Sequence, residues 1–134
     1  MNILLDTHIL IWALTNNLLL SDKAKEIIIN ENNEIYYSIV SLWEIEIKHI
    51  NNPKNLTLSS KIVADVAELS GYNLLPLNPR SIYKLQDLKR SDFAPRHKDP
   101  FDKILICQSI IGNMVFLTHD HLIVDYNIPN VLLV

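Results

Sequence analysis

The sequence predicts an α/β fold, in which a mostly parallel sheet of about four to five strands lies between two layers of helices. Three observations support this prediction. Short apolar runs alternate with longer helical patterns along the chain, as in folds built from strand–helix–strand units. The strand candidates are continuously apolar rather than alternating, which is typical of a sheet covered on both faces. No linker or repeat interrupts the 134 residues, so we expect a single domain over residues 1–134.

Five short segments have the composition of buried strands. They are Asn2–Leu5, Ile35–Val40, Asn73–Leu77, Met114–Thr118 and Ile128–Val134. Their brevity and their aliphatic, β-branched and aromatic residues favour strands over helices. We therefore expect these segments to form the sheet.

Helices are expected between the strands. They are Ile9–Leu14, a helix capped by Ser21, Ser41 to about Ile50, Ser60 to about Gly71, Pro79 to about Leu88, and Pro100–Ile111. Ser41 and Glu44 have the spacing of a capping box, and Asn78 precedes a proline at the first helical position. The segment Pro100–Ile111 is apolar on nearly all sides, which predicts a helix buried on several sides.

The composition excludes several functional classes. With only two glycines, Gly71 and Gly112, the chain lacks the glycine-rich loops that bind phosphates or dinucleotides. Its single cysteine, Cys107, excludes a disulfide framework and a multi-cysteine zinc site. A formal net charge of −3 excludes a strongly basic coat for non-specific DNA binding. No apolar stretch is long enough to span a membrane, and we expect a cytoplasmic protein.

Four acidic residues are placed so that they can share one site. Asp6 ends the first predicted strand, and Asp120 comes just after the fourth. Glu44 lies one turn into the helix after the second strand, and Asp102 opens the apolar helix before the fourth. In open α/β sheets, sites form at the carboxyl ends of the strands. If the sheet is doubly wound, all four carboxylates can point into one crevice.

Four clustered carboxylates repel one another, so we expect a cation among them. Hard oxygen ligands without cysteine favour Mg²⁺ or Mn²⁺ over zinc, and such a site suits phosphodiester hydrolysis. Each acid also has a purely structural interpretation. Asp6 and Asp102 can serve as helix caps, Glu44 can pair with Lys48, and Asp120 can be a loop residue.

Four segments that contain these acids follow one another in a fixed order. They are Leu4-Leu5-Asp6-Thr7-His8, Ser41-Leu42-Trp43-Glu44-Ile45, His97-Lys98-Asp99-Pro100-Phe101-Asp102-Lys103 with Ile104–Ile106, and Leu117-Thr118-His119-Asp120. Together they resemble the PIN-domain ribonucleases, in particular the VapC-type toxins of bacterial toxin–antitoxin pairs, over about Asn2 to Val134. The resemblance implies a three-layer α/β/α PIN-like domain that uses Mg²⁺ or Mn²⁺ to cleave structured RNA, such as tRNA or rRNA, and so inhibits translation. It also implies 3′-hydroxyl and 5′-phosphate ends, a homodimer and a cognate antitoxin.

The resemblance also implies roles for individual residues. The catalytic, metal-binding acids would be Asp6, Glu44, Asp102 and Asp120. Asp99 matches a further acid that either binds metal or supports the start of a helix. Thr7 and Thr118 match small hydroxyl positions that orient the carboxylates or a water. His119 departs from the residues usual before the last acid, which leaves its role open.

A basic stretch lies directly before and across Asp102. It consists of Lys89, Arg90, Arg96, His97, Lys98 and Lys103. It is either a solvated loop or a clamp for RNA phosphates, with Arg96, Lys98 and Lys103 as the candidate contacts. Trp43 is interpreted as core or dimer packing rather than as a platform for stacked bases.

Other functions were weighed against a ribonuclease. An HD-type metal phosphohydrolase would use His119-Asp120 with His97 and Asp125, but that class is all-helical. A haloacid-dehalogenase-like phosphatase would need a second acid where His8 stands. The non-enzymatic alternative is a PIN-like protein that binds RNA or a partner without cutting. Such a protein should have lost one or more acids, whereas every matching position here is filled.

Overall fold

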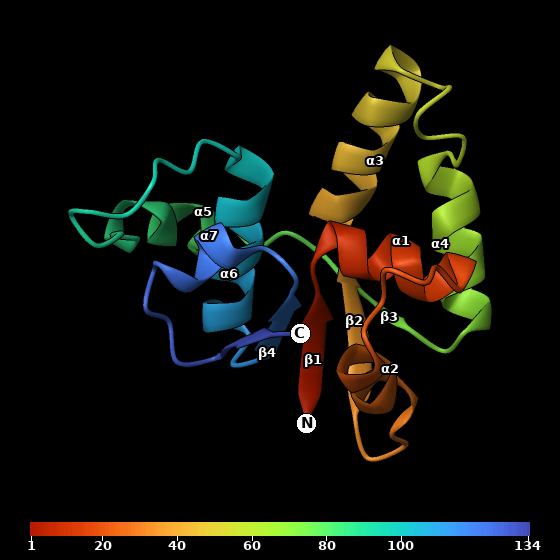
Figure 1. Cartoon of the computed structure of the whole chain (residues 1–134), viewed down its shortest axis with the longest axis horizontal. Coiled ribbons are helices and arrows are strands. Elements are labelled where there is room, and N and C mark those ends of the chain that lie inside the picture. The colour runs from red at the N-terminus through yellow and green to blue at the C-terminus, as the bar shows by residue number, and fades with distance from the viewer.

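A computed structural model of residues 1–134 shows five parallel strands between two layers of helices (Figure 1). The strands are β1 (Asn2–Leu5), β2 (Glu34–Ser38), β3 (Asn73–Leu75), β4 (Val115–Thr118) and β5 (Val131–Leu133). Their order across the sheet is β3-β2-β1-β4-β5, and every neighbouring pair is parallel. The chain therefore starts in the centre, moves to one edge and then fills the other. The predicted α/β fold class is confirmed.

Helices cover both faces of this sheet. One layer contains α1 (Thr7–Thr15), α2 (Asp22–Ile29) and α4 (Ser60–Leu69), and the other contains α5 (Pro79–Tyr83), the 3-10 helix η1 (Lys84–Asp87), α6 (Pro100–Ile111) and α7 (His121–Val124). The long helix α3 (Ile39–Asn51) rises beyond the sheet and packs against α1, α4 and α6 (Figure 1). None of the helices combines the length and the hydrophobicity that crossing a bilayer requires.

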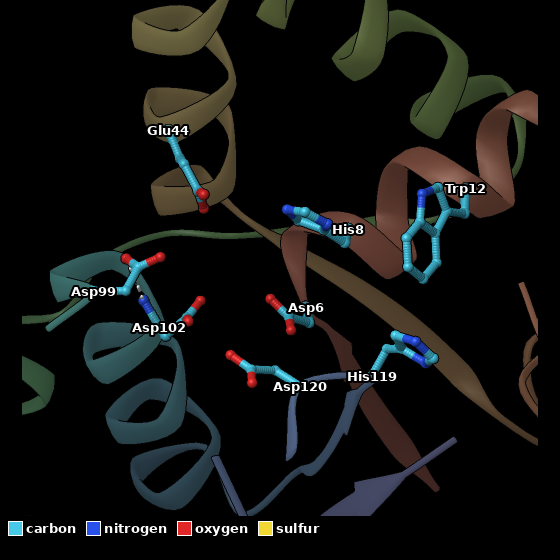
Figure 2. Close-up of a pocket in the computed structure, with 8 residues that line it drawn as sticks. All are labelled: Asp6, His8, Trp12, Glu44, Asp99, Asp102, His119 and Asp120. Atoms are coloured by element: carbon cyan, nitrogen blue, oxygen red, sulfur yellow. Dashed lines mark hydrogen bonds between the residues drawn. The ribbon is translucent and has the colours of Figure 1, made fainter. Parts of the chain in front are cut away.

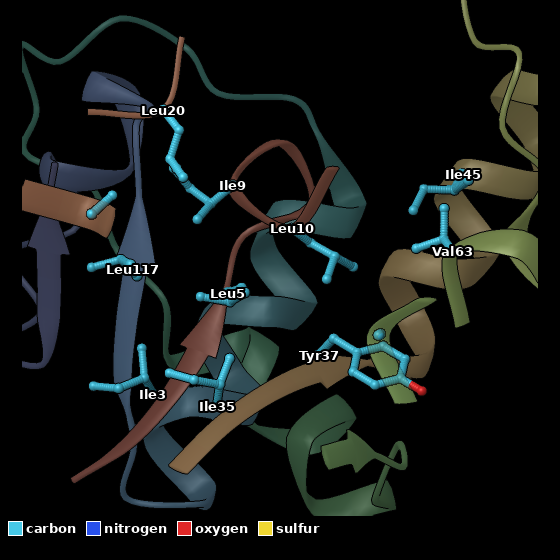
Figure 3. Close-up of a cluster of buried hydrophobic side chains, with 12 residues drawn as sticks. Ile3, Leu5, Ile9, Leu10, Leu20, Ile35, Tyr37, Ile45, Val63 and Leu117 are labelled. Carbon is cyan, nitrogen blue, oxygen red and sulfur yellow. The ribbon is translucent and has the colours of Figure 1, made fainter. Parts of the chain in front are cut away.

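The central strands supply side chains to two hydrophobic cores. Ile3 and Leu5 of β1 belong to the core under α1, α2 and α4 (Figure 3), whereas Leu4 belongs to the core under α6 and α7. In β4, Leu117 and Phe116 divide in the same way. All five side chains are fully buried. A strand that is buried on both faces has to be apolar at every position, which explains its continuous apolar sequence.

The junction between β2 and α3 differs from the sequence prediction. The strand ends at Ser38 instead of Val40, and Ser38 rather than Ser41 caps the helix, because its hydroxyl accepts a hydrogen bond from Val40 N at 3.0 Å. The same hydroxyl donates to Gln108 Oε1 of α6 at 2.5 Å. A partner that is distant in the sequence therefore fixes the start of α3. Glu44 belongs to the second turn of the helix and is not part of a capping box.

Other boundaries also differ, and α1 begins at Thr7 instead of Ile9. The helix predicted to reach Leu88 ends at Tyr83 and continues only as the 3-10 helix η1. The third strand ends at Leu75 instead of Leu77, because Pro76 has no N–H group to extend the ladder. The fifth strand comprises only the second half of its predicted run.

Candidate active site

The strand order places the carboxyl ends of β1 and β4 side by side, where the chain switches direction across the sheet. Asp6 follows β1 directly, and Asp120 lies two residues after the end of β4. Helix α3 brings Glu44 to the same edge, and the first turn of α6 brings Asp102 there. Together with Asp99, these acids line a cavity of about 320 Å³ (Figure 2). All four acids singled out from the sequence therefore meet in one place.

Asp6 is held rigidly by two hydrogen bonds. Its Oδ1 accepts a hydrogen bond from Thr7 N at 2.7 Å, and its Oδ2 accepts one from the Thr118 hydroxyl at 2.6 Å. The Thr118 hydroxyl oxygen also accepts from Asp120 N at 3.1 Å, so one buried side chain ties both acids together. Burial raises the pKa of Asp6 even though these hydrogen bonds favour its charged form.

Asp102 is hydrogen-bonded to a buried histidine. His97 Nε2 lies 3.0 Å from Asp102 Oδ2 and 3.9 Å from Asp120 Oδ2, and His97 Nδ1 lies 2.8 Å from the Tyr126 hydroxyl. His97, Asp102 and Asp120 place potential ligand atoms within 4.8 Å of one another. Burial, and then the charges of the neighbouring acids, raise the pKa of Asp102 from 3.8 to about 8.

Glu44 is buried and has one oxygen without a partner. Its Oε2 forms an ion pair with Lys48 Nζ at 2.6 Å, whereas Oε1 has no hydrogen-bond donor. Burial acts to lower the pKa of Lys48, but the hydrogen bond and charge of Glu44, with the charges of Asp99 and Asp102, outweigh burial and raise it. The Glu44 carboxylate points into the cavity (Figure 2). An unpartnered buried oxygen is unfavourable, and a cation in the cavity would satisfy it.

Asp99 and Thr7 have clear local roles. Asp99 caps α6, because its Oδ1 accepts hydrogen bonds from Phe101 N at 2.9 Å and Asp102 N at 3.4 Å. Asp99 also lines the cavity, so the geometry is compatible with both of its predicted roles. The Thr7 hydroxyl is hydrogen-bonded to the Ser41 hydroxyl at 2.9 Å rather than to an acid. Thr7 therefore orients Asp6 through its backbone N–H alone.

This set of side chains fits a hard divalent cation. Carboxylate oxygens are the ligands that Mg²⁺ and Mn²⁺ prefer. Both nitrogens of His97 are engaged, with Asp102 and Tyr126, so His97 supports an acid instead of offering a free ligand atom. Glu44 Oε1 lacks a hydrogen-bond partner, and burial, followed by the charges of the neighbouring acids, raises the pKa of Asp102. A cation in the cavity would compensate both.

The basic side chains singled out for RNA phosphates lie outside the acidic cavity. Lys98 is exposed. Arg96 and Lys103 line a separate hollow, which His97 also lines. Arg90, from the same basic stretch, has structural partners instead. It pairs with Asp125 at 3.0 Å and donates hydrogen bonds to two backbone carbonyls, so it fixes the loop before α6.

Sequence reasoning missed two features of the site. One is the contact of His97 with Asp102, because the sequence placed His97 only in the basic stretch and in the rejected HD-type site. The other is an aromatic wall of the cavity, made by His8, Trp12 and His119. The spacing of His8 and Trp12, four residues apart just after Asp6, places them on one face of a helix and was an available signal. Nothing local reveals the contact between His97 and Tyr126, which are 29 residues apart.

Trp43 does not belong to the core. Its side chain is 60% exposed, and its ring packs edge to face against Phe101, with the ring centroids 5.1 Å apart. It does not line the acidic cavity. Core packing is therefore wrong for this tryptophan, and the alternative of packing in a dimer stays a prediction.

Comparisons with known proteins place this geometry in a family. No curated protein matched the chain by sequence. Among solved structures, VapBC2 from Rickettsia felis bound to a promoter DNA fragment contains a chain that is 19% identical, with a TM-score of 0.68 and coverage of 100% of this chain and 98% of that one. A toxin–antitoxin complex from Klebsiella pneumoniae contains a chain that is 20% identical, with a TM-score of 0.54 and coverage of 96% and 94%. The family profile described as the PIN domain matches residues 3–127. The chain therefore belongs to the PIN domain family.

Proposed function

We propose that this protein is an endoribonuclease that depends on Mg²⁺ or Mn²⁺. The observation that carries the proposal is the convergence on one cavity of four acids from four separate parts of the chain: Asp6, Glu44, Asp102 and Asp120. Membership of the PIN domain family supports this reading. A non-catalytic PIN-like protein is disfavoured because none of the four acids is missing. The all-helical phosphohydrolase class is disfavoured by the parallel sheet.

Three neighbouring side chains position the acids that would hold a cation. When bound, the cation would polarise a phosphodiester and favour ionisation of the attacking water. Thr118 fixes Asp6 by donating to Oδ2, and His97 fixes Asp102 through the hydrogen bond at Oδ2. Lys48 pairs with one oxygen of Glu44 and leaves the other without a hydrogen-bond partner.

We also propose that the protein is the toxin of a toxin–antitoxin pair and acts on structured RNA such as tRNA or rRNA. The fold it shares with chains of two toxin–antitoxin complexes supports this role. A homodimer and a cognate antitoxin would cover apolar side chains that a single chain exposes, such as Leu18 at 95% and Leu69 at 87%. Arg96, Lys98 and Lys103 remain the proposed phosphate contacts.

Cleavage of RNA by the purified protein tests the enzymatic proposal. Total RNA is incubated with Mg²⁺, Mn²⁺ or EDTA, and the new ends are mapped. We expect cuts only with metal, leaving 3′-hydroxyl and 5′-phosphate ends. Asp6→Asn should keep the fold and abolish cleavage, whereas the control Asp92→Asn makes the same change in an exposed loop and should cut like wild type. Wild-type cleavage by Asp6→Asn in Mg²⁺ would show that the assignment is wrong.

Growth of cells that express the protein tests the toxin role separately. Expression of the wild type should arrest growth, and expression of Asp6→Asn should not. Co-expression of a short open reading frame encoded beside the gene should restore growth by supplying the antitoxin. Unimpaired growth at high expression of active wild-type enzyme would contradict the toxin role and leave the ribonuclease proposal standing.

A further inference from the structure

One wall of the acidic cavity has no part in holding a cation. His8, Trp12 and His119 gather there, on the side of the cavity away from Asp99 and Asp102 (Figure 2). The Trp12 ring centroid lies 5.7 Å from that of His8 and 5.3 Å from that of His119, with the ring planes nearly perpendicular in both pairs. The cavity therefore has an acidic half and an aromatic half.

The aromatic wall also borders a second hollow. This hollow, of about 510 Å³, shares His8 and Trp12 with the acidic cavity, so the two are adjacent. Four of its other lining residues carry amide side chains, Asn17, Asn51, Asn52 and Asn55. Amide groups donate to and accept from the edges of nucleobases. The space beside Trp12 therefore combines aromatic rings with the polar groups that bases require.

We propose that His8, Trp12 and His119 form a nucleobase-binding subsite for a nucleotide that flanks the cleaved phosphodiester. This inference deepens the proposed ribonuclease function and rests on it. Unpaired bases stack on aromatic side chains in a way that needs no net charge. The protein is acidic overall, and its cavity is lined by five acids, so the phosphates of RNA are repelled there unless a cation is bound. Stacking supplies attraction that charge alone does not provide.

The exposure of the three rings favours this role over simple core packing. His8 and His119 are exposed, and Trp12 is half-buried with its indole at the cavity wall. Trp12 also contacts the core under α1, which fixes the position of the indole. Because the core already holds the indole on one side, a base that stacks on the side open to the cavity costs Trp12 little side-chain conformational entropy.

Fluorescence of Trp12 gives a direct test that does not depend on cleavage. The chain has two tryptophans, so Trp43→Phe leaves Trp12 as the only indole, and Asp6→Asn in the same chain prevents cutting. This variant is titrated with a short single-stranded RNA and with an oligomer of equal length that has abasic sites. We expect quenching by the RNA and roughly 5- to 100-fold weaker binding of the abasic oligomer. Equal binding of the two oligomers, or no quenching by RNA, would overturn the subsite.

Cleavage kinetics separate this proposal from the ribonuclease proposal. Trp12→Leu keeps only apolar bulk and should raise KM roughly 5- to 100-fold with little change in kcat, whereas Trp12→Phe keeps a smaller aromatic face and should raise KM clearly less than Trp12→Leu. His119→Ala alters an exposed ring without disturbing the core and should raise KM less. Trp43→Leu is the matched control and should change neither constant.

Each remaining outcome has a distinct meaning. If folded Trp12→Leu and His119→Ala both cut RNA like wild type, the subsite is wrong and the ribonuclease proposal stands. If no form of the protein cuts RNA, the ribonuclease proposal fails, and the fluorescence titration alone decides whether bases bind. If Trp12→Leu loses binding of the antitoxin while its affinity for RNA is unchanged, the surface belongs to a protein partner and the subsite is overturned.

Discussion

At the scale of single residues, one buried hydroxyl sets the position of two acids of the site. Thr118 donates to Asp6 Oδ2 and accepts from Asp120 N. The resemblance to PIN-domain ribonucleases implied a supporting role for Thr118. It could not reveal the bond to Asp6, because the two residues are 112 positions apart and meet only through the pairing of β1 with β4.

Replacement of Thr118 by valine should therefore weaken both the fold and the enzyme. Valine has a similar shape but leaves a buried oxygen of Asp6 without its donor, which costs about 1–3 kcal/mol of unfolding free energy. Thr118→Ser retains the hydroxyl and should recover most of the stability and the RNA cleavage. Chemical denaturation and cleavage rates check both variants. Equal activity of the valine and serine variants would show that the hydroxyl does not position Asp6.

A second residue-scale prediction concerns the partner of His97. When Asp102 is ionised, it accepts from His97 Nε2–H, and a neutral His97 then accepts at Nδ1 from the Tyr126 hydroxyl. Tyr126→Phe keeps the ring but removes the donor that fixes this tautomer. We expect the Mg²⁺ concentration for half-maximal cleavage to rise by about 10- to 100-fold. The control Tyr83→Phe, at a 68% exposed side chain, should behave like wild type. If Tyr126→Phe needs the same Mg²⁺ concentration as wild type, the Tyr126 hydroxyl does not help to position Asp102 through His97.

At the scale of elements, the starts of helices decide where the acids point. Local sequence located the start of α6, whose cap Asp99 bonds only to its own first turn. It misplaced the start of α3, because Ser38 is also held by Gln108, which is 70 positions away. Local sequence therefore sufficed for the start of α6, whereas a tertiary contact selects the cap of α3.

The start of α6 yields a prediction that separates the two roles of Asp99. Asn is as good a helix cap as Asp, whereas loss of the cap in alanine costs typically about 1 kcal/mol. Asp99→Asn should melt no lower than wild type in EDTA and require more Mg²⁺ for cleavage, because one charge facing the cation is removed. Asp99→Ala should show the same Mg²⁺ effect and also melt lower. If Asp99→Asn needs no more Mg²⁺ for cleavage than wild type, Asp99 acts only as a helix cap and does not bind the cation.

At the scale of the whole molecule, sheet topology brings the site together. The sequence predicted the fold class and placed acids near the ends of strands, because strands buried on both faces have a clear apolar signature. No local pattern encodes the strand order, which sets Asp6 beside Asp120, and none encodes the approach of His119 to Trp12. Those features depend on packing between segments that are far apart in the sequence.

The crowding of acids makes stability of the whole protein depend on pH. The pKa of Asp102 is about 8 in the folded protein against an ordinary 3.8, so near neutral pH the folded state binds a proton that the unfolded state has lost. Without divalent metal, the free energy of unfolding should therefore fall as the pH rises from 6.5 to 8. Burial lowers the pKa of His97 below its ordinary 6.5, so near pH 6.5 the unfolded state binds part of a proton at His97 that the folded state has lost. This difference reduces the fall near pH 6.5 without cancelling it, and it fades toward pH 8, where His97 is neutral in both states.

Urea denaturation at several pH values measures this slope. Saturating Mg²⁺ should flatten it, because the cation takes the place of the proton, and Asp102→Asn should flatten it without metal. A metal-free wild-type protein whose stability is constant or rises between pH 6.5 and 8 would show that Asp102 is not protonated in the folded state.

The melting temperature of wild type and Asp6→Asn across a Mg²⁺ titration tests most directly whether the distant acids form one cation site. The wild type should gain about 2.7 kcal/mol of stability at a Mg²⁺ concentration 100 times the dissociation constant. Asp6→Asn should melt higher than wild type in EDTA, because one of the mutually repelling charges is gone, and should gain little from Mg²⁺. A wild type that does not respond to Mg²⁺, or an Asp6→Asn protein that gains as much as wild type, would contradict a shared site.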